Sequence, residues 1–459
     1  MRWLPPALVL AAVAIGYANA LGASYQFDDW SVIVRDPRVQ DLAAWWASMP
    51  GIRPLLKLSY ALNHESGLGV AGFHAVNVAI HAGNGLLALW LVRRLLAGLA
   101  FAPADAGWIA LATALIFVLH PVQTEAVTYA SGRSTSLAVF FSFASLAAWV
   151  SGRERGNRLL AGLVSPLLML LGLATKEIAV VVPALLLLWL ATDVSRPWRW
   201  RAALSATAVH WLLLALALAG ALALPAYRAF VATSLATRGM GENLIAQSRG
   251  IAYLAGQLLH IDRLNADPAL AAVTTLDGAG LLLVLAITGI AGLALAGLRR
   301  APLPSFAVLW FLVWLAPTNS LLARLDLVND RQLYAALLGP ALLLAVAIHR
   351  LGTRRPGLGS VALAPVLLLT GLATHLRNDV YRDEVGFWRN VVEQSPYNPR
   401  AFNNLGVALA TECDLPRAAA AWRRALELDP GDVRVAVNLR LLADGVLPEG
   451  VGPCPPRSP

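Results

Sequence analysis

Residues 3–21 read WLPPALVLAAVAIGYANAL, and residues 25–30, which follow almost directly, read YQFDDW. The first stretch contains no charged side chain and is about as long as a helix that crosses a bilayer. The second stretch places two adjacent carboxylates, Asp28 and Asp29, among aromatic side chains at the point where such a helix would meet water. Carboxylates are costly to desolvate at a membrane. The pair therefore predicts either a solvated loop cap or a functional site at the membrane surface.

The apolar character of the first segment extends along the whole chain. Of the 459 residues, 58% are hydrophobic and 14% are charged, and the mean hydropathy is +0.62. This composition excludes a soluble globular protein and predicts an all-α, polytopic membrane protein with about eleven transmembrane helices. The predicted spans are residues 3–21, 73–91, 107–119, 136–150, 159–174, 178–190, 203–224, 279–298, 306–316, 333–348 and 358–373.

The positions of arginine predict the orientation of these spans. Cytoplasmic loops are enriched in Arg and Lys, so the loops that carry arginine clusters are expected in the cytoplasm and the other loops outside it. The same rule accounts for the net charge of +9 without a nucleic-acid partner. The clusters follow alternate spans, at residues 93–94, 153–155, 196–201, 299–300 and 350–355.

The first segment has an alternative interpretation as a cleaved signal peptide. Arg2 precedes it, and Ala18-Asn19-Ala20 resembles a cleavage site. Both interpretations leave Asp28 and Asp29 outside the cytoplasm.

Polar motifs gather at the span ends that are predicted to lie outside. Each motif has a structural alternative, because a His-Asn-His stripe can pack between helices and opposite charges can pair at loop ends. Arg and Lys at span ends also suit the phosphate of a lipid headgroup, and a carboxylate beside them suits a general base that activates a hydroxyl. The motifs are Asp28 and Asp29 with Arg53; His74, Asn77 and His81; the stretch from His120 through Glu125 to Arg133; Lys176 and Glu177; and Asn329, Asp330 and Arg331.

The C-terminal part carries a helical repeat pattern. Residues 398–431 match one tetratricopeptide unit of 34 residues, with small Gly406 and Ala418 set against large Trp422. Residues 383–396 match the second helix of an incomplete earlier repeat, and residues 432–442 match a capping helix. So short an array cannot form a long groove. It predicts either a small helical cap without a ligand or a docking site for a protein partner.

The far C-terminus, residues 448–459, is rich in Pro and Gly and is expected to be disordered. Cys413 and Cys454 match no metal-binding spacing. A disulfide between them stays open as an alternative if this end of the chain lies outside the cytoplasm.

These motifs resemble those of the transmembrane and tetratricopeptide-repeat O-mannosyltransferases and their bacterial relatives, within the GT-C glycosyltransferase superfamily. The resemblance covers nearly the whole chain, and its most specific part runs from His120 to Arg133. The chain departs from the animal members by carrying little more than one repeat. The matching stretches are residues 27–29, 53–55, 72–77 with His81, 120–127, 132–134, 175–177 and 329–331, together with the repeat.

The resemblance implies an inverting transfer of a sugar, usually mannose, from a polyprenyl-phosphate donor to a hydroxyl on a protein or glycan acceptor. Asp28 or Asp29 would be the general base, with Asp28 favoured. Residues 1–376 would form the GT-C-like membrane domain, with extracytoplasmic loops 23–72 and 225–278, and residues 377–447 the repeat domain. Arg133, Lys176 and Arg331 would bind the donor phosphate, supported by Arg53, His74, His81, His120, Glu125, Glu177 and Asp330.

The resemblance further implies a multi-pass protein of a bacterial inner membrane, with its active site and C-terminal domain on the periplasmic side. Some members of the superfamily use a divalent metal. No residue cluster in this sequence reads as a metal cage, so we expect none.

Two functions of other classes fit parts of the pattern. A lipid or sugar transporter would carry charged residues deep within its spans and paired broken helices, whereas the motifs here gather at one face. A membrane-anchored repeat scaffold would not need acidic and basic motifs on several separate loops. The glycosyltransferase is therefore the favoured interpretation.

Overall fold

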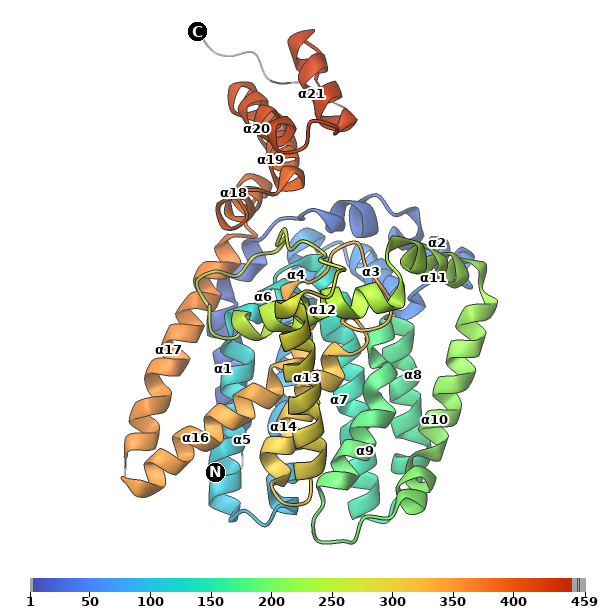
Figure 1. The fold of residues 1–459 in the computed structure, drawn as a ribbon, viewed down its shortest axis with the longest axis vertical. Helices are drawn as coiled ribbons and strands as arrows, with labels where there is room; N and C mark the ends of the chain where they lie inside the picture. Colours follow the sequence, from blue (N-terminus) through green and yellow to red (C-terminus); the bar gives the residue numbers. More distant parts are fainter. Residues whose placement is uncertain (1–2, 356, 448–451, 453, 455–459) are drawn as a thin grey trace.

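The computed structural model describes residues 3–355, 357–447, 452 and 454. Every regular element in this part of the chain is helical. Long helices lie side by side in one bundle, short helices lie across one end of it, and the C-terminal helices stand beyond that end (Figure 1). The predicted class, an all-helical membrane protein, is confirmed.

The bundle is built from apolar helices that coincide with the predicted spans. Five helices are long and apolar enough to cross a membrane, or up to seven if each of two bent pairs is one span. Shorter apolar helices occupy the other predicted positions, so the number eleven stays a prediction. The bundle helices are α1 (Leu4–Gly16), α4 (Gly69–Gly98), α5 (Pro103–Leu119), α7 (Arg133–Glu154), α8 (Ser165–Thr175), α9 (Val182–Thr192), α10 (Trp200–Ala223), α13 (Gly278–Gly297), α14 (Pro302–Leu315), α16 (Leu338–Arg354) and α17 (Leu358–Asp379).

Both bent pairs carry a polar motif on their short arm. A bend of 54° separates α5 from Pro121–Val127, and a bend of 56° separates Asp330–Ala336 from α16. Pro121 lacks the N–H that would continue α5, and the freed backbone turns around His120, whose Nδ1 accepts a hydrogen bond from the N–H of Val122. The two short arms bring Glu125 and Arg331 together, as described below.

Short helices form a layer across one end of the bundle (Figure 1). Residues 225–278, which we expected as a long loop, contain two of these helices. The connections from α9 to α10 and from α13 to α14, which carry arginine clusters, lie at the opposite end. The layer consists of α2 (Leu42–Ala47), α3 (Pro54–Glu65), α6 (Thr124–Val127), α11 (Pro225–Thr237) and α12 (Met240–Gln257).

Short helical turns also occur between the longer helices. They are η1 (Ala18–Gly22), η2 (Trp30–Val34), η3 (Pro37–Val39), η4 (Pro121–Gln123), η5 (Ala130–Gly132), η6 (Leu160–Val164), η7 (Glu177–Val181) and η8 (Asp330–Gln332), with α15 (Leu333–Ala336) leading into α16. Of these turns, η2 and η6 are π-helical and the other η elements are 3-10 turns.

The C-terminal helices are α18 (Glu384–Gln394), α19 (Pro399–Thr411), α20 (Leu415–Leu428) and α21 (Val433–Ala443). Gly406 on α19 faces the indole of Trp422 on α20, and a Cβ at this glycine would lie 2.6 Å from Trp422 Cδ1. The Trp422 indole N–H donates to the Asn403 carbonyl oxygen at 3.1 Å. The small and large residues of the repeat pattern thus meet in one seam, while the tetratricopeptide assignment itself stays a prediction.

A disulfide joins Cys413 to Cys454. The expected disordered tail, residues 448–459, lies outside the described residues except for Gly452 and Cys454.

Ion pairs fix the C-terminal helices to two loops, the one that follows α12 and the one between α14 and η8. Arg400 at the start of α19 pairs with Asp267, and with Asp326 at 2.7 Å. The Asn398 side-chain amide donates to the Asp267 carboxylate at 3.1 Å, and that of Asn265 donates to the Ser395 hydroxyl at 2.7 Å. These contacts hold the C-terminal helices over the polar end of the bundle.

The separation of the two ends predicts their accessibility. In a Cys413→Ser/Cys454→Ser background, a cysteine at Ser66 after α3 should react with a membrane-impermeant maleimide added to intact cells. A cysteine at Ser195, between α9 and α10, should react only after permeabilisation, because the arginine-rich end is expected in the cytoplasm. Labelling of both positions from the same side would contradict this topology.

Candidate active site

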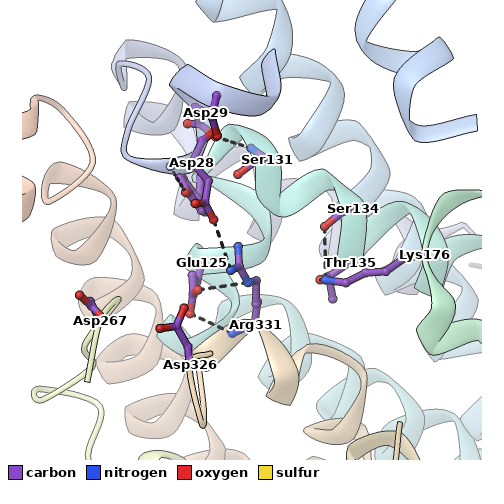
Figure 2. A network of polar contacts seen from close by, with 12 residues as sticks. Asp28, Asp29, Glu125, Ser131, Ser134, Thr135, Lys176, Asp267, Asp326 and Arg331 are labelled. Atoms are coloured by element: carbon purple, nitrogen blue, oxygen red, sulfur yellow. Dashed lines mark hydrogen bonds and ion pairs between the residues drawn. The ribbon is translucent and has the colours of Figure 1, made fainter. Parts of the chain in front are cut away.

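The two adjacent carboxylates have opposite surroundings (Figure 2). Asp29 is fully buried, and its oxygens accept hydrogen bonds from the backbone N–H groups of Gln26 (3.0 Å) and Ser131 (2.7 Å). Burial raises the pKa of the Asp29 carboxyl to about 7, and the two N–H groups act in the opposite direction. The Asp28 side chain is 40% exposed and its Oδ2 lies 3.7 Å from Nη2 of Arg331. Asp29 therefore fixes the loop, and Asp28 is the carboxylate available to a substrate.

The backbone around Asp28 is held in an unusual conformation. Phe27 has φ +36°, a region that side chains other than glycine rarely adopt. Its ring packs edge-on against Trp388 of α18 at a centroid distance of 5.1 Å, and the N–H of Asp28 donates to the Tyr129 hydroxyl at 2.8 Å. Arg53, across the cavity described next, also has a positive φ, +53°. Such strain persists where surrounding contacts overdetermine it, often at functional sites.

Glu125 positions the cation closest to Asp28. Its carboxylate is 4% exposed and accepts a hydrogen bond from the backbone N–H of Arg331 at 3.0 Å, while its other oxygen lies 3.5 Å from Arg331 Nε. The Arg331 guanidinium also lies over the ring of Tyr129, 5.7 Å from its centroid. Glu125 and Tyr129 thus hold Arg331 between Asp28 and the cavity.

A cavity of about 330 Å³ opens beside Asp28. Asp36, one of its two lining carboxylates, is already paired with Arg38 at 2.7 Å. The cavity therefore carries an excess of positive charge, which favours an anionic ligand. Its six cationic lining residues are Arg38, Arg53, Lys57, Lys176, Arg324 and Arg331, from the first large loop, the α8–η7 junction and the segment before η8.

Three of these six cations, Lys57, Lys176 and Arg324, form no ion pair among the described residues. Lys176 is 7% exposed, and its ammonium donates to the hydroxyls of Thr135 (2.7 Å) and Ser134 (3.3 Å). Burial, with Arg331 and Arg53 nearby, holds the pKa of Lys176 well below its usual range. Burial and the same two arginines lower the pKa of Arg324 to about 10. An anion in the cavity would stabilise the charged forms of both side chains.

Two smaller cavities adjoin the first and share its residues. One of them has Lys176, Arg324 and Arg331 in common with the first cavity. The apolar side chains of Val139 and Ile178 also line it. Trp314 and Asn329 also line it, and their buried side-chain N–H groups have no partner among the described residues. Buried donors without partners are uncommon in folded proteins, so these are free to contact a ligand.

The other small cavity lies beneath the C-terminal helices. It has Asp28 and Arg331 in common with the cationic cavity. Its other lining residues include Asp326, Tyr381 and, from α18, Phe387. Asp28 therefore stands between the cationic cavity and a second opening at the C-terminal helices.

Arg133, predicted as a phosphate ligand, lies outside these cavities. Its guanidinium is fully buried and donates to Asn77 Oδ1 (2.7 Å) and to the carbonyl oxygens of Ser59 (3.0 Å) and Phe73 (2.9 Å). Because the protein already accepts its hydrogen bonds, we leave Arg133 out of the proposed phosphate site.

The three predicted histidines also make contacts within the protein. His74 Nε2 donates to the Ala23 carbonyl at 3.0 Å, and His120 Nε2 donates to that of Leu258 at 3.2 Å. His81 donates to the Val118 carbonyl at 3.1 Å and accepts from the Tyr334 hydroxyl at 2.7 Å. These contacts match the packing alternative for the His-Asn-His stripe.

Glu177 and Asp330 do not line these three cavities. Glu177 pairs with Arg53 at 2.7 Å, and Asp330 is 2% exposed.

The sequence motifs did not include Arg324, although this residue lies in the same predicted extracytoplasmic loop as Asn329. Among the described residues, no group of three or more His, Cys, Asp or Glu side chains is arranged to hold a metal ion.

The different surroundings of the two carboxylates predict different effects of the same substitution. Asp29→Asn should destabilise the folded protein by about 1–3 kcal/mol, because the amide nitrogen would face a buried N–H donor. Asp28→Asn should leave stability within about 0.5 kcal/mol of the native protein, as at other partly exposed positions. Thermal unfolding of the purified variants, followed by the fraction that stays monodisperse, measures this difference. Equal destabilisation would mean that Asp29 is not the residue that fixes the loop.

Comparison with known proteins finds relatives of one kind. The chain is 31% identical to "Protein O-mannosyl-transferase Tmtc2" of Drosophila melanogaster over 186 residues, which are 36% of this chain and 19% of that protein. It is 29% identical to human "Protein O-mannosyl-transferase TMTC4" over 181 residues, 34% of this chain and 24% of the relative. Similarity to mouse "Protein O-mannosyl-transferase TMTC3" is 24% over 485 residues, covering 94% of this chain and 52% of the relative.

No protein-family model and no solved structure matches the chain. The chain spans about half the length of TMTC3 and about a fifth to a quarter of the other two relatives. All three relatives are named protein O-mannosyl-transferases of the TMTC series, and one alignment runs over nearly the whole chain. The chain is therefore homologous to the TMTC protein O-mannosyl-transferases.

Proposed function

We propose that the chain is a membrane glycosyltransferase that moves a sugar, mannose by its homology, from a polyprenyl-phosphate donor to a hydroxyl acceptor. The observation that carries this proposal is the pairing of Asp28, a partly exposed carboxylate on a fixed loop, with a cavity lined by six cationic side chains. The relatives are named protein O-mannosyl-transferases, which supports a hydroxyl on a protein as the acceptor.

In the proposed reaction, the acceptor oxygen attacks the anomeric carbon of the sugar while the bond from that carbon to the phosphate oxygen breaks. Asp28 takes the proton of the acceptor hydroxyl as the new bond forms. The phosphate leaves with the electron pair of the broken bond, and Arg331, Lys176 and Arg324 stabilise its growing negative charge. Attack opposite the leaving phosphate inverts the configuration at the anomeric carbon.

The apolar and polar walls of the site suit the two ends of such a donor. Val139, Ile178 and Trp314 border the cations on the bundle side, where the first isoprene units would lie. The acceptor would then approach from the other side of Asp28, past Tyr381 and Phe387. In this arrangement Asp28 stands between donor and acceptor, as a general base must.

The proposed location is the extracytoplasmic face of a bacterial inner membrane. The arginine clusters lie on the loops at the end away from the site, in keeping with the positive-inside rule. The disulfide between Cys413 and Cys454 lies in the part that would be periplasmic, and disulfides persist in oxidising compartments.

The two bent helix pairs also fit a transporter, because broken helices often build transport sites. Purified protein in detergent separates the two functions. A transferase should still transfer the sugar there, whereas a transporter has no second compartment to supply and should give no glycosylated product.

The base assignment predicts that Asp28→Asn lowers transfer by about 10²–10⁴-fold, the usual contribution of a positioned base. Binding of the donor should change little, because the amide keeps the shape of the side chain. Single-turnover transfer of labelled sugar and equilibrium donor binding measure the two effects. Asp36→Asn is the matched control, since Asp36 lines the same cavity but is paired with Arg38. Turnover of Asp28→Asn within about tenfold of the native protein would rule out this base.

The phosphate assignment predicts that Lys176→Ala, Arg324→Ala and Arg331→Ala each raise the donor KM by about tenfold, because each removes a charge-assisted contact. Arg35→Ala, an exposed arginine at the same end of the bundle that does not line the cavity, controls for the loss of one charge. Arg133→Ala should instead reduce the yield of folded protein. A wild-type KM in all three cavity variants would place the phosphate elsewhere.

A further inference from the structure

A larger cavity, of about 680 Å³, lies among the described residues at the opposite end of the bundle from Asp28. Residues at the ends of α4, α7, α9 and α10 and in the connection from α9 to α10 line it. Figure 1 shows the connection from α9 to α10 at the end of the bundle away from the C-terminal helices. Nothing in the proposed transfer reaction uses this cavity. Its cationic lining residues are Arg94, Arg153, Arg196 and Arg199, and its acidic ones are Glu154 and Asp193.

Each acidic side chain of the cavity already has an arginine partner. Arg94 lies 3.6 Å from Glu154, and Arg196 lies 4.0 Å from Asp193. Arg153 and Arg199 form no ion pair among the described residues. The Arg153 guanidinium lies over the indole of Trp149, 4.9 Å from the ring centroid, which leaves its edge free to donate hydrogen bonds. The cavity thus has cationic groups in excess, as an anion site requires.

The loop that closes the cavity is held in place. The Arg299 guanidinium, at the end of α13, donates to the carbonyl oxygens of Ala191, Asp193, Val194 and Arg196. The Ser195 backbone N–H donates to the Asp193 carboxylate at 3.0 Å. These contacts come from another helix and from the loop itself, so this wall does not depend on a bound ligand for its shape.

The rest of the lining is apolar and leads to a surface suited to lipid. Leu95, Leu190 and Ala206 continue the cavity away from the arginines. The neighbouring helix α10 is apolar, and only 17% of its apolar membrane-length stretch is buried within the protein. A ligand that fits both parts has an anionic head and an apolar chain.

We infer that this cavity binds the phosphate headgroup of an anionic phospholipid from the leaflet opposite the candidate active site. Arg153 and Arg199 would contact the phosphate oxygens, and the acyl chains would lie along α10. Basic pockets between transmembrane helices recognise anionic headgroups in this way. The inference does not rest on the proposed transfer reaction, since the two cavities have no residue in common.

Native mass spectrometry of the purified full chain in detergent tests the inference. The probes are dioleoyl phosphatidylglycerol, dioleoyl phosphatidylcholine with the same chains, and glycerol phosphate as the headgroup alone. Phosphatidylglycerol should bind about tenfold or more tightly than the other two probes, and Arg153→Ala/Arg199→Ala should lose about that preference. Arg155→Ala/Arg158→Ala is the matched control, because it removes two exposed charges at the same end that do not line the cavity.

Three results would overturn the inference. They are equal binding of the two phospholipids, an unchanged preference in Arg153→Ala/Arg199→Ala, and binding of glycerol phosphate as tight as that of the lipid, which would indicate a site for soluble phosphates. If the double variant does not fold, Arg199→Ala carries the test, since Arg199 lies in an exposed loop. Sugar transfer is measured on the same samples, so that loss of lipid binding and loss of catalysis are recorded separately.

Discussion

The two N–H groups that point at the Asp29 carboxylate come from distant parts of the chain: one from Gln26, three residues before Asp29, and one from Ser131, 102 residues after it. A buried carboxylate without donors would be strongly destabilising. This double hydrogen bond therefore locks the loop of residues 25–30 onto the turn before α7. The attachment fixes the backbone beside Asp28, whose carboxylate is 40% exposed and faces Arg331, the cation held by Glu125 and Tyr129.

Charge is balanced behind the cavity wall and left unbalanced within the cavity. Glu125 neutralises Arg331 and Glu177 neutralises Arg53 from positions outside or beneath the cavity. Lys176 meets only neutral hydroxyls. A folded protein keeps such an arrangement at a cost in stability, because buried like charges repel. The proposed binding of an anionic donor phosphate would offset that cost.

Much of the fold could be predicted because span length and arginine position follow directly from the bilayer. The different roles of Asp28 and Asp29 also follow from adjacency, since neighbouring side chains on a turn diverge. The place of Arg133 could not be predicted in the same way. A cation at a span mouth suits a phosphate or a set of carbonyl oxygens equally well, and the structure supplies Asn77, Ser59 and Phe73 as partners.

Arg324 and the helices of residues 225–278 were missed for related reasons. Arg324 reaches the cavity from a part of the loop that belongs to none of the motifs in the sequence. The helices α11 and α12 lie across the end of the bundle, where a helix needs no long apolar run.

The packing of Phe27 against Trp388 affects the order in which parts of the protein fold during synthesis. Ala23, Tyr129 and Trp388 belong to one hydrophobic cluster, and the N–H of Ser24 donates to the carbonyl of Tyr381. Segments that lie far apart along the chain, one after α1 and one after α17, therefore share a core. Chains grow from the N-terminus and form distant contacts late. The loop that carries Asp28 consequently reaches its final shape only after α18 has left the ribosome, and therefore after the bundle helices from α1 to α17 have been made.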